Sequence, residues 1–471
     1  MNISNFFKSG SLLFLGNLVT AISGLLRNVI IARLISVENF GIAATFAVTV
    51  SFVEMSNAIA VDRLLVQDRQ GNNSKLQATS QAFLAIRGVL NAAVLYFAAG
   101  FIGRLFELQQ LTWAFEVLAL IPLLRGFAHL DVARLQRQMK FTAVIASEAL
   151  PQLLTVVLAT PLALYFGDYR VMLWILILQT IAQVIGSHLL AIRKYRWSWK
   201  TKFIKKIMIF GWPLLLNGFV MFGIFQADRI IVGSLFNMEM LGWFSAAFTL
   251  TLLPSLLLTR VHQSLFLPIL SLKQNLHTNF QQYSLLTFHI CLLSGLLLSV
   301  GFLLAGPAFF LLIFGDKYSE GVTIIALLGL MQGFRLFKLG PIIIALAKGR
   351  TKLPLLTNLV RGFWIIIAVA VANTFRDIQL IVLCGVIGEF TAFIFSLIYL
   401  KKMKIVKLQK VIPTLVVSLM CLLGAFLMAI EHIIGAQPLM EIALTAVVLL
   451  VIVLCYVRSN AVIIRLLKTL T

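Results

Sequence analysis

The chain has 471 residues, of which 60% are hydrophobic, and its mean hydropathy is +0.99. A soluble domain does not carry so much apolar surface, so the composition excludes a soluble enzyme or binding module. The formal net charge of +22 would suit a protein that binds nucleic acid, but the placement of the charges argues against that class.

Apolar stretches of about 20 residues recur along the chain, and each can cross the hydrocarbon core of a membrane as a helix. The period-two alternation of barrel strands is absent, which leaves helices as the way to satisfy the backbone in lipid. We predict an all-α polytopic membrane protein of about fourteen transmembrane helices, the first of which is not a cleaved signal peptide. The spans are expected at 9–32, 40–61, 77–103, 111–130, 142–166, 171–192, 207–233, 241–270, 283–314, 321–346, 354–372, 377–400, 411–431 and 438–457.

Basic residues gather in the connections that lie on the same side as the amino terminus, above all in the segment RKYRWSWKTKFIKK at 193–206. The connections on the opposite side hold only Arg33, Arg104, Arg170, Lys317 and Arg376. The positive-inside rule then predicts that both termini are cytoplasmic. The basic runs also predict contacts with anionic membrane lipids, and we expect no nucleic acid partner.

One segment occurs twice. The stretch RNVIIARLISVENFGIAATF begins at Arg27, and DRIIVGSLFNMEMLGWFSAA begins at Asp228, six expected spans later. The matched columns include Leu34 with Leu235, Glu38 with Glu239, Gly41 with Gly242 and Ala44 with Ser245. An even offset means that both copies cross the membrane in the same direction. Such parallel repeats predict two six-helix lobes with a site between them near the midplane.

The repeat also predicts the domain organisation. We expect an amino-terminal lobe at 1–203, a second lobe at 204–402, and two additional helices at 403–471. Two lobes around a central cavity are typical of a transporter that works by alternating access. The four cysteines and six histidines show no metal-ligand spacing, and no phosphate-binding loop is present. We therefore expect no metal, no cofactor and no ATPase in this chain.

Charged residues within the expected spans mark the candidate site, because a charge in the bilayer is costly unless it faces a polar interior or a partner. Seven lie deep: Arg27, Arg87, Arg335, Lys338, Glu54, Asp228 and Glu389. The four cations are candidates for substrate binding in the cavity, and the three acids for gating or ion coupling. Arg335 and Lys338 are three residues apart and should share one helix face. A structural ion pair is the alternative for each residue.

Two further expectations concern pairing and depth. Arg27 and Asp228 lie at matching depths in the repeat and could pair to close an outer gate, or Arg27 could pair with Glu54 within its own lobe. Arg125, Arg260 and Arg361 are expected within a few turns of the inner face. Side chains that extend to the interface explain these three arginines as well as a ligand role does.

Several segments resemble one family. ARLISVENFG after the first span, LQRQMKF after the fourth, RVHQSLFLPILSLK leaving the eighth, and the stretch from Ile313 to Lys352 are similar to bacterial polysaccharide transporters. These are the oligosaccharide-lipid flippases, of O-antigen type, of the multidrug/oligosaccharidyl-lipid/polysaccharide exporter superfamily. The segments occur in the family's order and cover most of the chain. Asn39 and Leu267 depart from residues that are frequent in the family.

The resemblance implies flipping of an undecaprenyl-pyrophosphate-linked oligosaccharide across the bacterial cytoplasmic membrane, for O-antigen, capsule or exopolysaccharide biosynthesis. It implies a cationic cavity that binds the pyrophosphate, and coupling to H+ or Na+. The deep cations Arg87, Arg335, Lys338 and Arg27 are the candidates for this binding. A polymerase and other membrane proteins of the glycan pathway are the partners it suggests. The alternatives are a cation-coupled multidrug exporter of the same superfamily, a polytopic polymerase or ligase, and a scaffold. The short outer connections argue against an enzyme, and the buried charges argue against a scaffold.

Overall fold

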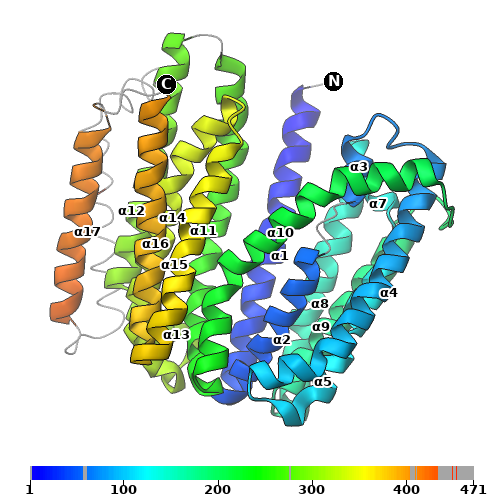
Figure 1. Cartoon of the computed structure of the whole chain (residues 1–471), viewed down its shortest axis with the longest axis horizontal. Helices are drawn as coiled ribbons and strands as arrows, with labels where there is room; N and C mark the ends of the chain where they lie inside the picture. The colour runs from blue at the N-terminus through cyan, green and yellow to red at the C-terminus, as the bar shows by residue number, and fades with distance from the viewer. Residues whose placement is uncertain are drawn as a thin grey trace. The chain divides into compact units, whose positions relative to one another are not determined.

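The computed structural model describes residues 3–56, 61–274, 277–403 and 411–432, together with the single residues 409, 448 and 452. Across these ranges every regular element is an α-helix or a short 3-10 helix (Figure 1). Eleven of the described helices are long and apolar enough to cross a membrane, or twelve if one bent pair counts as a span. The prediction of an all-α polytopic protein is therefore confirmed. Apart from the single residues 448 and 452, the last expected span, 438–457, lies outside the described residues.

The chain forms two compact units, Met1–Gly242 and Trp243–Thr471. The helices of the first unit are α1 (Ile3–Leu34), α2 (Val37–Ser56), α3 (Val61–Gln67), α4 (Ser74–Leu105), η1 (Gln109–Leu111), α5 (Thr112–Leu118), α6 (Leu120–Gly126), α7 (Asp131–Arg137), α8 (Thr142–Phe166), α9 (Arg170–Leu189) and α10 (Thr201–Leu235). The remaining helices are α11 (Met238–Lys273), α12 (His277–Leu304), α13 (Gly306–Phe314), η2 (Asp316–Gly321), α14 (Val322–Ala347), α15 (Lys352–Phe375), α16 (Ile378–Lys402) and α17 (Ile412–His432).

In the first unit α8 packs against α1 and α9, and α4 packs against α5 and α6. Helix α10 runs obliquely across this unit and packs against α2, α3 and α4 (Figure 1). The first compact unit therefore extends beyond residue 203, where the repeat places the end of the first lobe. The lobes at 1–203 and 204–402 and the additional helices at 403–471 stay a prediction. In the second unit α14 packs against α12 and α16, and α15 packs against α16.

The expected span at 111–130 is not a single straight helix. Helix α5 ends at Leu118, and the span continues in α6. Pro122 of α6 has no amide hydrogen to donate to the Leu118 carbonyl. The following short helix α7 is bent by 52° from the segment Gln109–Gly126. The break brings the loop before α7 and the end of α9 to the same end of the first unit, as the hydrogen bond from the His188 ring to the Phe127 carbonyl shows.

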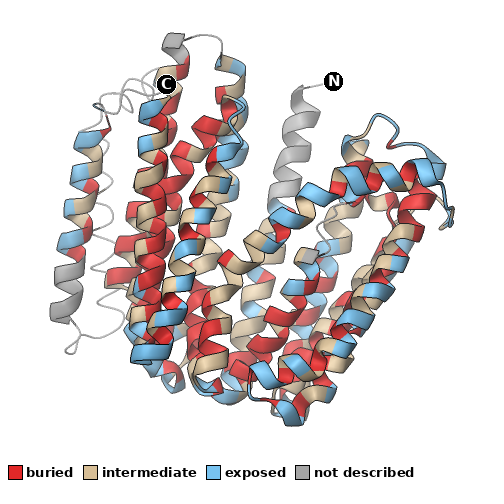
Figure 2. Ribbon diagram, in the orientation of Figure 1, coloured by how far each residue is buried: buried red, intermediate tan, exposed pale blue. Residues whose placement is uncertain are grey.

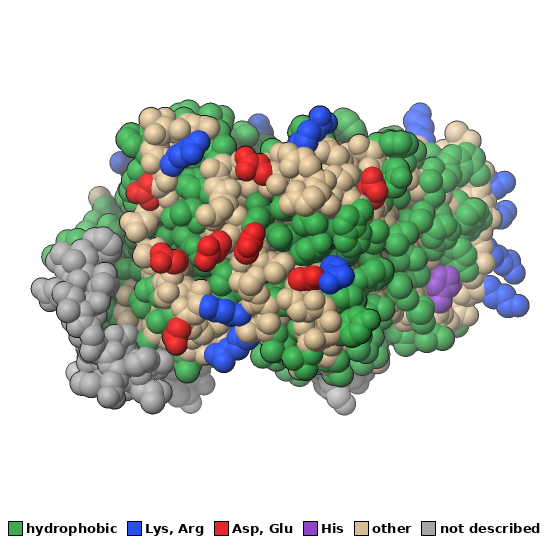
Figure 3. All heavy atoms as spheres, turned by 90° about the horizontal axis from the view of Figure 1, so that it is seen from below, with side chains coloured by type: hydrophobic (Ala, Val, Ile, Leu, Met, Phe, Trp, Pro, Cys, Tyr) green, Lys and Arg blue, Asp and Glu red, His purple; other side chains and the backbone are tan. Residues whose placement is uncertain are grey.

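The outer surfaces of several helices are apolar, as lipid requires. On α4 the side chains of Val94, Phe97 and Phe101 are exposed, and on α8 those of Val157 and Leu164 are exposed. Figure 2 shows buried residues on the opposite sides of such helices, and Figure 3 shows how much of the surface is hydrophobic. Side chains of this kind would be unfavourable in water over so wide an area, so they face hydrocarbon in a multi-pass membrane protein.

The two copies of the repeat touch through their glycines. A Cβ atom added to Gly41 would meet the carbonyl oxygen of Met238, and one added to Gly242 would meet the carbonyl oxygen of Val37. Val37 and Met238 occupy equivalent columns of the repeat, as do Gly41 and Gly242. The contact is therefore reciprocal: each copy offers a glycine to the first turn of the other. Only a residue without a side chain allows the backbones to come so close.

Candidate functional site: two internal charged regions

The first unit contains an open cavity of about 530 Å³ with charged and amide side chains in its wall. Its wall is built by α1, α2, α3, α4, α6, α7, α8 and α9, so helices far apart in sequence contribute to it. The charged residues that line it are Glu54, Asp62, Arg87, Arg125 and Glu148. Two of the predicted site residues, Arg87 and Glu54, therefore line one cavity.

A pair of glycines explains why the two arginines share a wall. A Cβ atom on Gly88 would lie 2.6 Å from Gly126 Cα, and one on Gly126 would lie 3.0 Å from Gly88 Cα. The glycines let the backbones of α4 and α6 approach closely. Arg87 and Arg125 each directly precede one of these glycines in sequence and line the same cavity. Two cations are thereby placed on the wall of one cavity.

Glu54 of α2 forms an ion pair with Arg125 of α6, with 2.5 Å between Oε1 and Nη1. The two side chains are 41% and 28% exposed, so the pair is open to the cavity. Water in the cavity screens such a pair, which then contributes at most about 1 kcal/mol to stability. The pair is therefore easily exchanged for contacts with a charged ligand.

Arg27 of α1 donates hydrogen bonds to side-chain amide oxygens. Its Nη1 donates to Gln179 Oε1 at 2.8 Å, and Gln179 Nε2 donates to Gln152 Oε1 at 2.7 Å. Both glutamines also line the large cavity, and a smaller cavity of about 180 Å³ joins Arg27 to Glu54 and Arg125. Arg27 is thus connected to the same polar region, although its hydrogen-bond partners are glutamine and asparagine side chains rather than Glu54 or Asp228.

Asp228 is placed differently from the acids that line the large cavity. It is buried in α10, with 5% of its surface exposed, and it does not belong to the lining of the large cavity. Its neighbour Gln226 donates a hydrogen bond to Ser51 of α2 at 3.3 Å. The predicted gating role of Asp228 is therefore not tied to the cavity and stays a prediction.

The second unit contains a buried charge cluster centred on Glu389 of α16. Arg335 donates from Nε to Glu389 Oε1 at 3.0 Å, and Lys338 Nζ donates to Oε2 at 2.6 Å. Both cations come from α14, so the prediction that they share one face is confirmed. Arg361 Nε of α15 lies 3.9 Å from Oε1. In this part of the described chain, three cations converge on one carboxylate that is fully buried.

Glycines also make room for this cluster. A Cβ atom on Gly388 would lie 2.9 Å from Arg361 Cδ, and one on Gly385 would lie 3.4 Å from Arg361 Nη2. The arginine therefore lies against a groove in α16 that these two glycines leave open. Arg361 has 0% of its surface exposed. Of the two explanations that the sequence left open for Arg361, extension to the interface is wrong, because the side chain is buried against α16.

The structure thus groups the predicted residues into two regions. Arg87 and Glu54 line one cavity with Arg27 beside it, and Arg335, Lys338 and Glu389 form one cluster. The sequence analysis left Arg125 and Arg361 outside the candidate site, with a ligand role weighed equally against extension to the interface. Arg125 directly precedes Gly126, and Arg361 packs against Gly385 and Gly388 of α16. Glycines in the spans were the sequence signal that arginines could be accommodated between helices.

Comparison with known proteins agrees with this architecture. The model of the family described as "Polysaccharide biosynthesis protein" matches residues 30–323. No curated protein sequence matches the chain. Among solved structures, the lipid II flippase MurJ in an inward closed conformation is similar, with a TM-score of 0.70 and 17% identity. The similarity covers 95% of this chain and 99% of MurJ.

Transporters of the multidrug and toxin extrusion (MATE) family share the fold as well. An inward-facing multidrug resistance transporter of that family, in the MOP superfamily, has a TM-score of 0.66 and 16% identity over 82% of this chain and 94% of its own. A MOP superfamily transporter from Pyrococcus furiosus, described as having a binding pocket of reverse polarity, has a TM-score of 0.55 and 15% identity over 83% and 93%. The matched family model spans more than half of the residues, and the chain belongs to the polysaccharide biosynthesis protein family, with the fold of MOP superfamily transporters.

Proposed function

We propose that this protein is a flippase that moves a polyprenyl-pyrophosphate-linked oligosaccharide across the bacterial cytoplasmic membrane by alternating access. Its product would feed cell-surface polysaccharide synthesis, with a polymerase and other membrane proteins of that pathway as partners. Both termini would be cytoplasmic. The family membership and the MurJ-like fold support a transport role rather than an enzymatic one.

The observation that carries the proposal is the convergence of cationic side chains in the second unit. Arg335, Lys338 and Arg361 all approach the carboxylate of Glu389. Arginine and lysine side chains gathered at one place suit a cargo that carries negative charge. Pyrophosphate supplies that charge, and guanidinium groups bind phosphate oxygens in pairs.

In the first unit, Arg87 and Arg27 are the corresponding candidates for the pyrophosphate. Arg87 lines the cavity of about 530 Å³, and Arg27 reaches it through Gln179. The neighbouring ion pair of Glu54 with Arg125 is half-exposed. A phosphate entering the cavity would compete with Glu54 for Arg125, which gives Glu54 a gating role. Glu389 would act in the same way in the second unit, where it holds Arg335 and Lys338.

The acids are also the candidates for ion coupling. Protonation of Glu389, or binding of Na+ near Glu54, would change which cations are available to the cargo. Asp228 is proposed as a gate residue together with Arg27 in another conformation of the transport cycle. A charge exchange tests this: if Arg27→Asp combined with Asp228→Arg exports no better than the worse single variant, the direct pair does not form.

A second candidate function is multidrug export. The specific observation in its favour is that Glu54, Asp62 and Glu148 line the first cavity, since acidic groups suit organic cations. The likeness to a MATE transporter, with a TM-score of 0.66, is compatible with it. On this reading the acids would bind the cargo and the arginines would be structural.

One experiment separates the two functions. Purified protein is reconstituted in liposomes, and the movement of a fluorescent polyprenyl-pyrophosphate oligosaccharide is compared with that of ethidium. The flippase proposal expects movement of the lipid-linked glycan that Arg335→Ala abolishes, and no ethidium flux. In cells that lack the protein, lipid-linked glycan should accumulate on the inner leaflet. Ethidium flux that depends on Glu54, without glycan movement, would instead establish the drug exporter.

A further inference from the structure

The segment between α9 and α10 is extended, yet it is fixed to the first unit by its backbone. The carboxylate of Asp131 accepts the amide hydrogens of Ile192 at 2.9 Å and Arg193 at 3.1 Å. Further along, the Ser198 amide donates to the Ala78 carbonyl of α4 at 3.4 Å. The segment therefore holds its side chains in defined positions beside the first turns of α4.

Arg193 is the residue of this segment that is bound most firmly. Its Nη1 donates to Gln77 Oε1, and its Nη2 donates to the Asn72 carbonyl, each at 3.0 Å. Both acceptors are neutral, so these hydrogen bonds orient the guanidinium without cancelling its charge. The nearby carboxylate of Asp131 is fully buried and is bound by Arg134.

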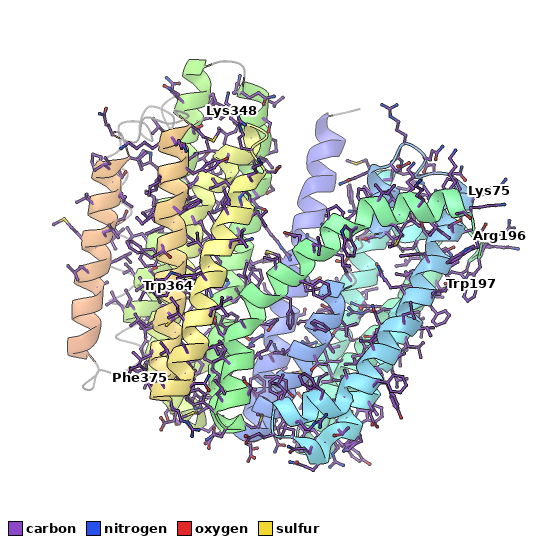
Figure 4. The ribbon with its side chains drawn as sticks, viewed as in Figure 1. Lys75, Arg196, Trp197, Lys348, Trp364 and Phe375 are labelled. Carbon is purple, nitrogen blue, oxygen red and sulfur yellow. The ribbon has the colours of Figure 1, made fainter. Side chains whose placement is uncertain are left out.

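A cavity of about 260 Å³ lies at this place. Its lining consists of Ser74, Gln77, Ala78, Gln81, Arg193, Lys194 and Arg196. No carboxylate contributes to the lining, and Figure 4 shows Lys75 and Arg196 at the same end of the first unit. In the described ranges, Lys75, Arg193, Lys194 and Arg196 form no ion pair with an acidic side chain. Hydroxyl, amide and cationic donors around a small cavity are the chemistry of a phosphate site.

Exposed apolar side chains flank the cavity and indicate where the phosphate comes from. Trp197 stacks on Phe127, with ring centroids 6.4 Å apart and an interplanar angle of 23°, and is 59% exposed. Leu189 and Ile192, just before the basic residues, are 80% and 69% exposed. Tryptophan beside basic residues is typical of the membrane interface on the cytoplasmic side. A water-soluble phosphate compound would not need this apolar border, whereas acyl chains would lie against it.

We propose that this cavity, the basic pocket at the start of α4, binds the headgroup phosphate of an anionic phospholipid. Lys194 and Arg196 contact the phosphate, Arg193 is oriented toward it by Gln77 and Asn72, and Leu189 and Ile192 contact the acyl chains. The site is distinct from the cavity that contains Arg87, because the two linings share no residue. The inference does not depend on the proposed function, since it concerns lipid binding and not transport.

The test is native mass spectrometry of the purified full-length protein, titrated in detergent with phosphatidylglycerol and, separately, with phosphatidylcholine. The variant is Lys194→Ala with Arg196→Ala, which leaves the structural contacts of Arg193 in place. The matched control is Lys202→Ala with Lys205→Ala, which removes two exposed charges of α10 that lie outside the pocket lining. The affinity for the first phosphatidylglycerol should fall roughly tenfold in the pocket variant and hardly change in the control.

Three results would overturn the proposal. Equal weakening in the pocket variant and the control would mean diffuse surface attraction, and no weakening in the pocket variant would mean that the site is elsewhere. With undecaprenyl pyrophosphate as a second probe, a loss confined to that lipid would assign the pocket to the cargo instead. The charge-preserving exchange Lys194→Arg with Arg196→Lys should retain binding. Arg196→Ala alone provides the test if the double variant does not fold, as thermal unfolding in detergent will show.

Discussion

Lys338 Nζ lies 2.6 Å from Glu389 Oε2, and the two side chains are 7% and 0% exposed. Arg335 and Arg361 approach the other carboxylate oxygen, so one anion stabilises three cations inside the second unit. The arrangement is asymmetric. Loss of one cation leaves Glu389 with two others, whereas loss of the anion leaves three buried positive charges together.

This asymmetry gives a prediction about stability. Glu389→Gln should destabilise the protein by about 3–5 kcal/mol, the usual effect of removing one member of a buried ion pair, and Lys338→Met by clearly less. Thermal unfolding in detergent measures both. The double variant should be more stable than the sum of the two single effects predicts, because the partners are coupled. Additive effects would show that Lys338 and Glu389 act independently.

A second prediction concerns cargo. Arg87→Ala should abolish glycan export at normal protein abundance, because the cavity loses a cation that binds phosphate. Arg87→Lys should restore export in part, since the charge returns without the planar fork, and Arg87→Gln should not. Export is followed by the surface polysaccharide of complemented cells.

The same helix offers the control for that experiment. Arg104 lies in the last turn of α4 and is exposed, so Arg104→Ala should export normally. Normal export by Arg87→Ala would remove Arg87 from the cargo site. Equal loss in all Arg87 variants together with a lowered melting temperature would make the residue structural.

A third prediction concerns the contact between the repeats. Gly41→Ala and Gly242→Ala should each destabilise the protein by about 1–3 kcal/mol, because a methyl group meets a carbonyl oxygen of the opposite copy. Gly100→Ala is the control, since its Cβ would enter open space and the helix gains about 0.5–1 kcal/mol from losing a glycine. Melting temperatures that shift in the same direction for all three variants would contradict the contact.

A fourth prediction concerns topology. The fourteen predicted spans would return the chain to its starting side, so a reporter that works only in the periplasm should be inactive when fused after Thr471. The same reporter inserted after Lys317, in a connection expected outside, should be active. Activity at the carboxyl terminus would mean an odd number of spans.

The sequence predicts this architecture well because hydropathy reports directly on whether a segment can lie in lipid. It predicts the shared face of Arg335 and Lys338 equally well, since helical spacing alone decides that relation. The interruption at Ala119 was not predicted, because a proline in the first turn of a helix is compatible with both a continuous and a broken span. The burial of Arg361 depends on the rotation of α15 toward the glycines of α16, which no pattern within α15 specifies.

The partner of Glu54 illustrates the same limit. The sequence analysis named Arg27 as its partner within the lobe, whereas the structure pairs Glu54 of α2 with Arg125 of α6. Pairings between helices depend on distances that are set by small residues elsewhere. A list of charges in spans therefore identifies the participants but not the pairs.

The reciprocal contact of Gly41 and Gly242 has a consequence for how the chain tolerates mutation. The two glycines lie at equivalent positions of the repeat but are 201 residues apart, so a single mutation changes only one of them. A side chain introduced at either position meets the unaltered backbone of the other copy, so both positions must stay glycine for the contact to form.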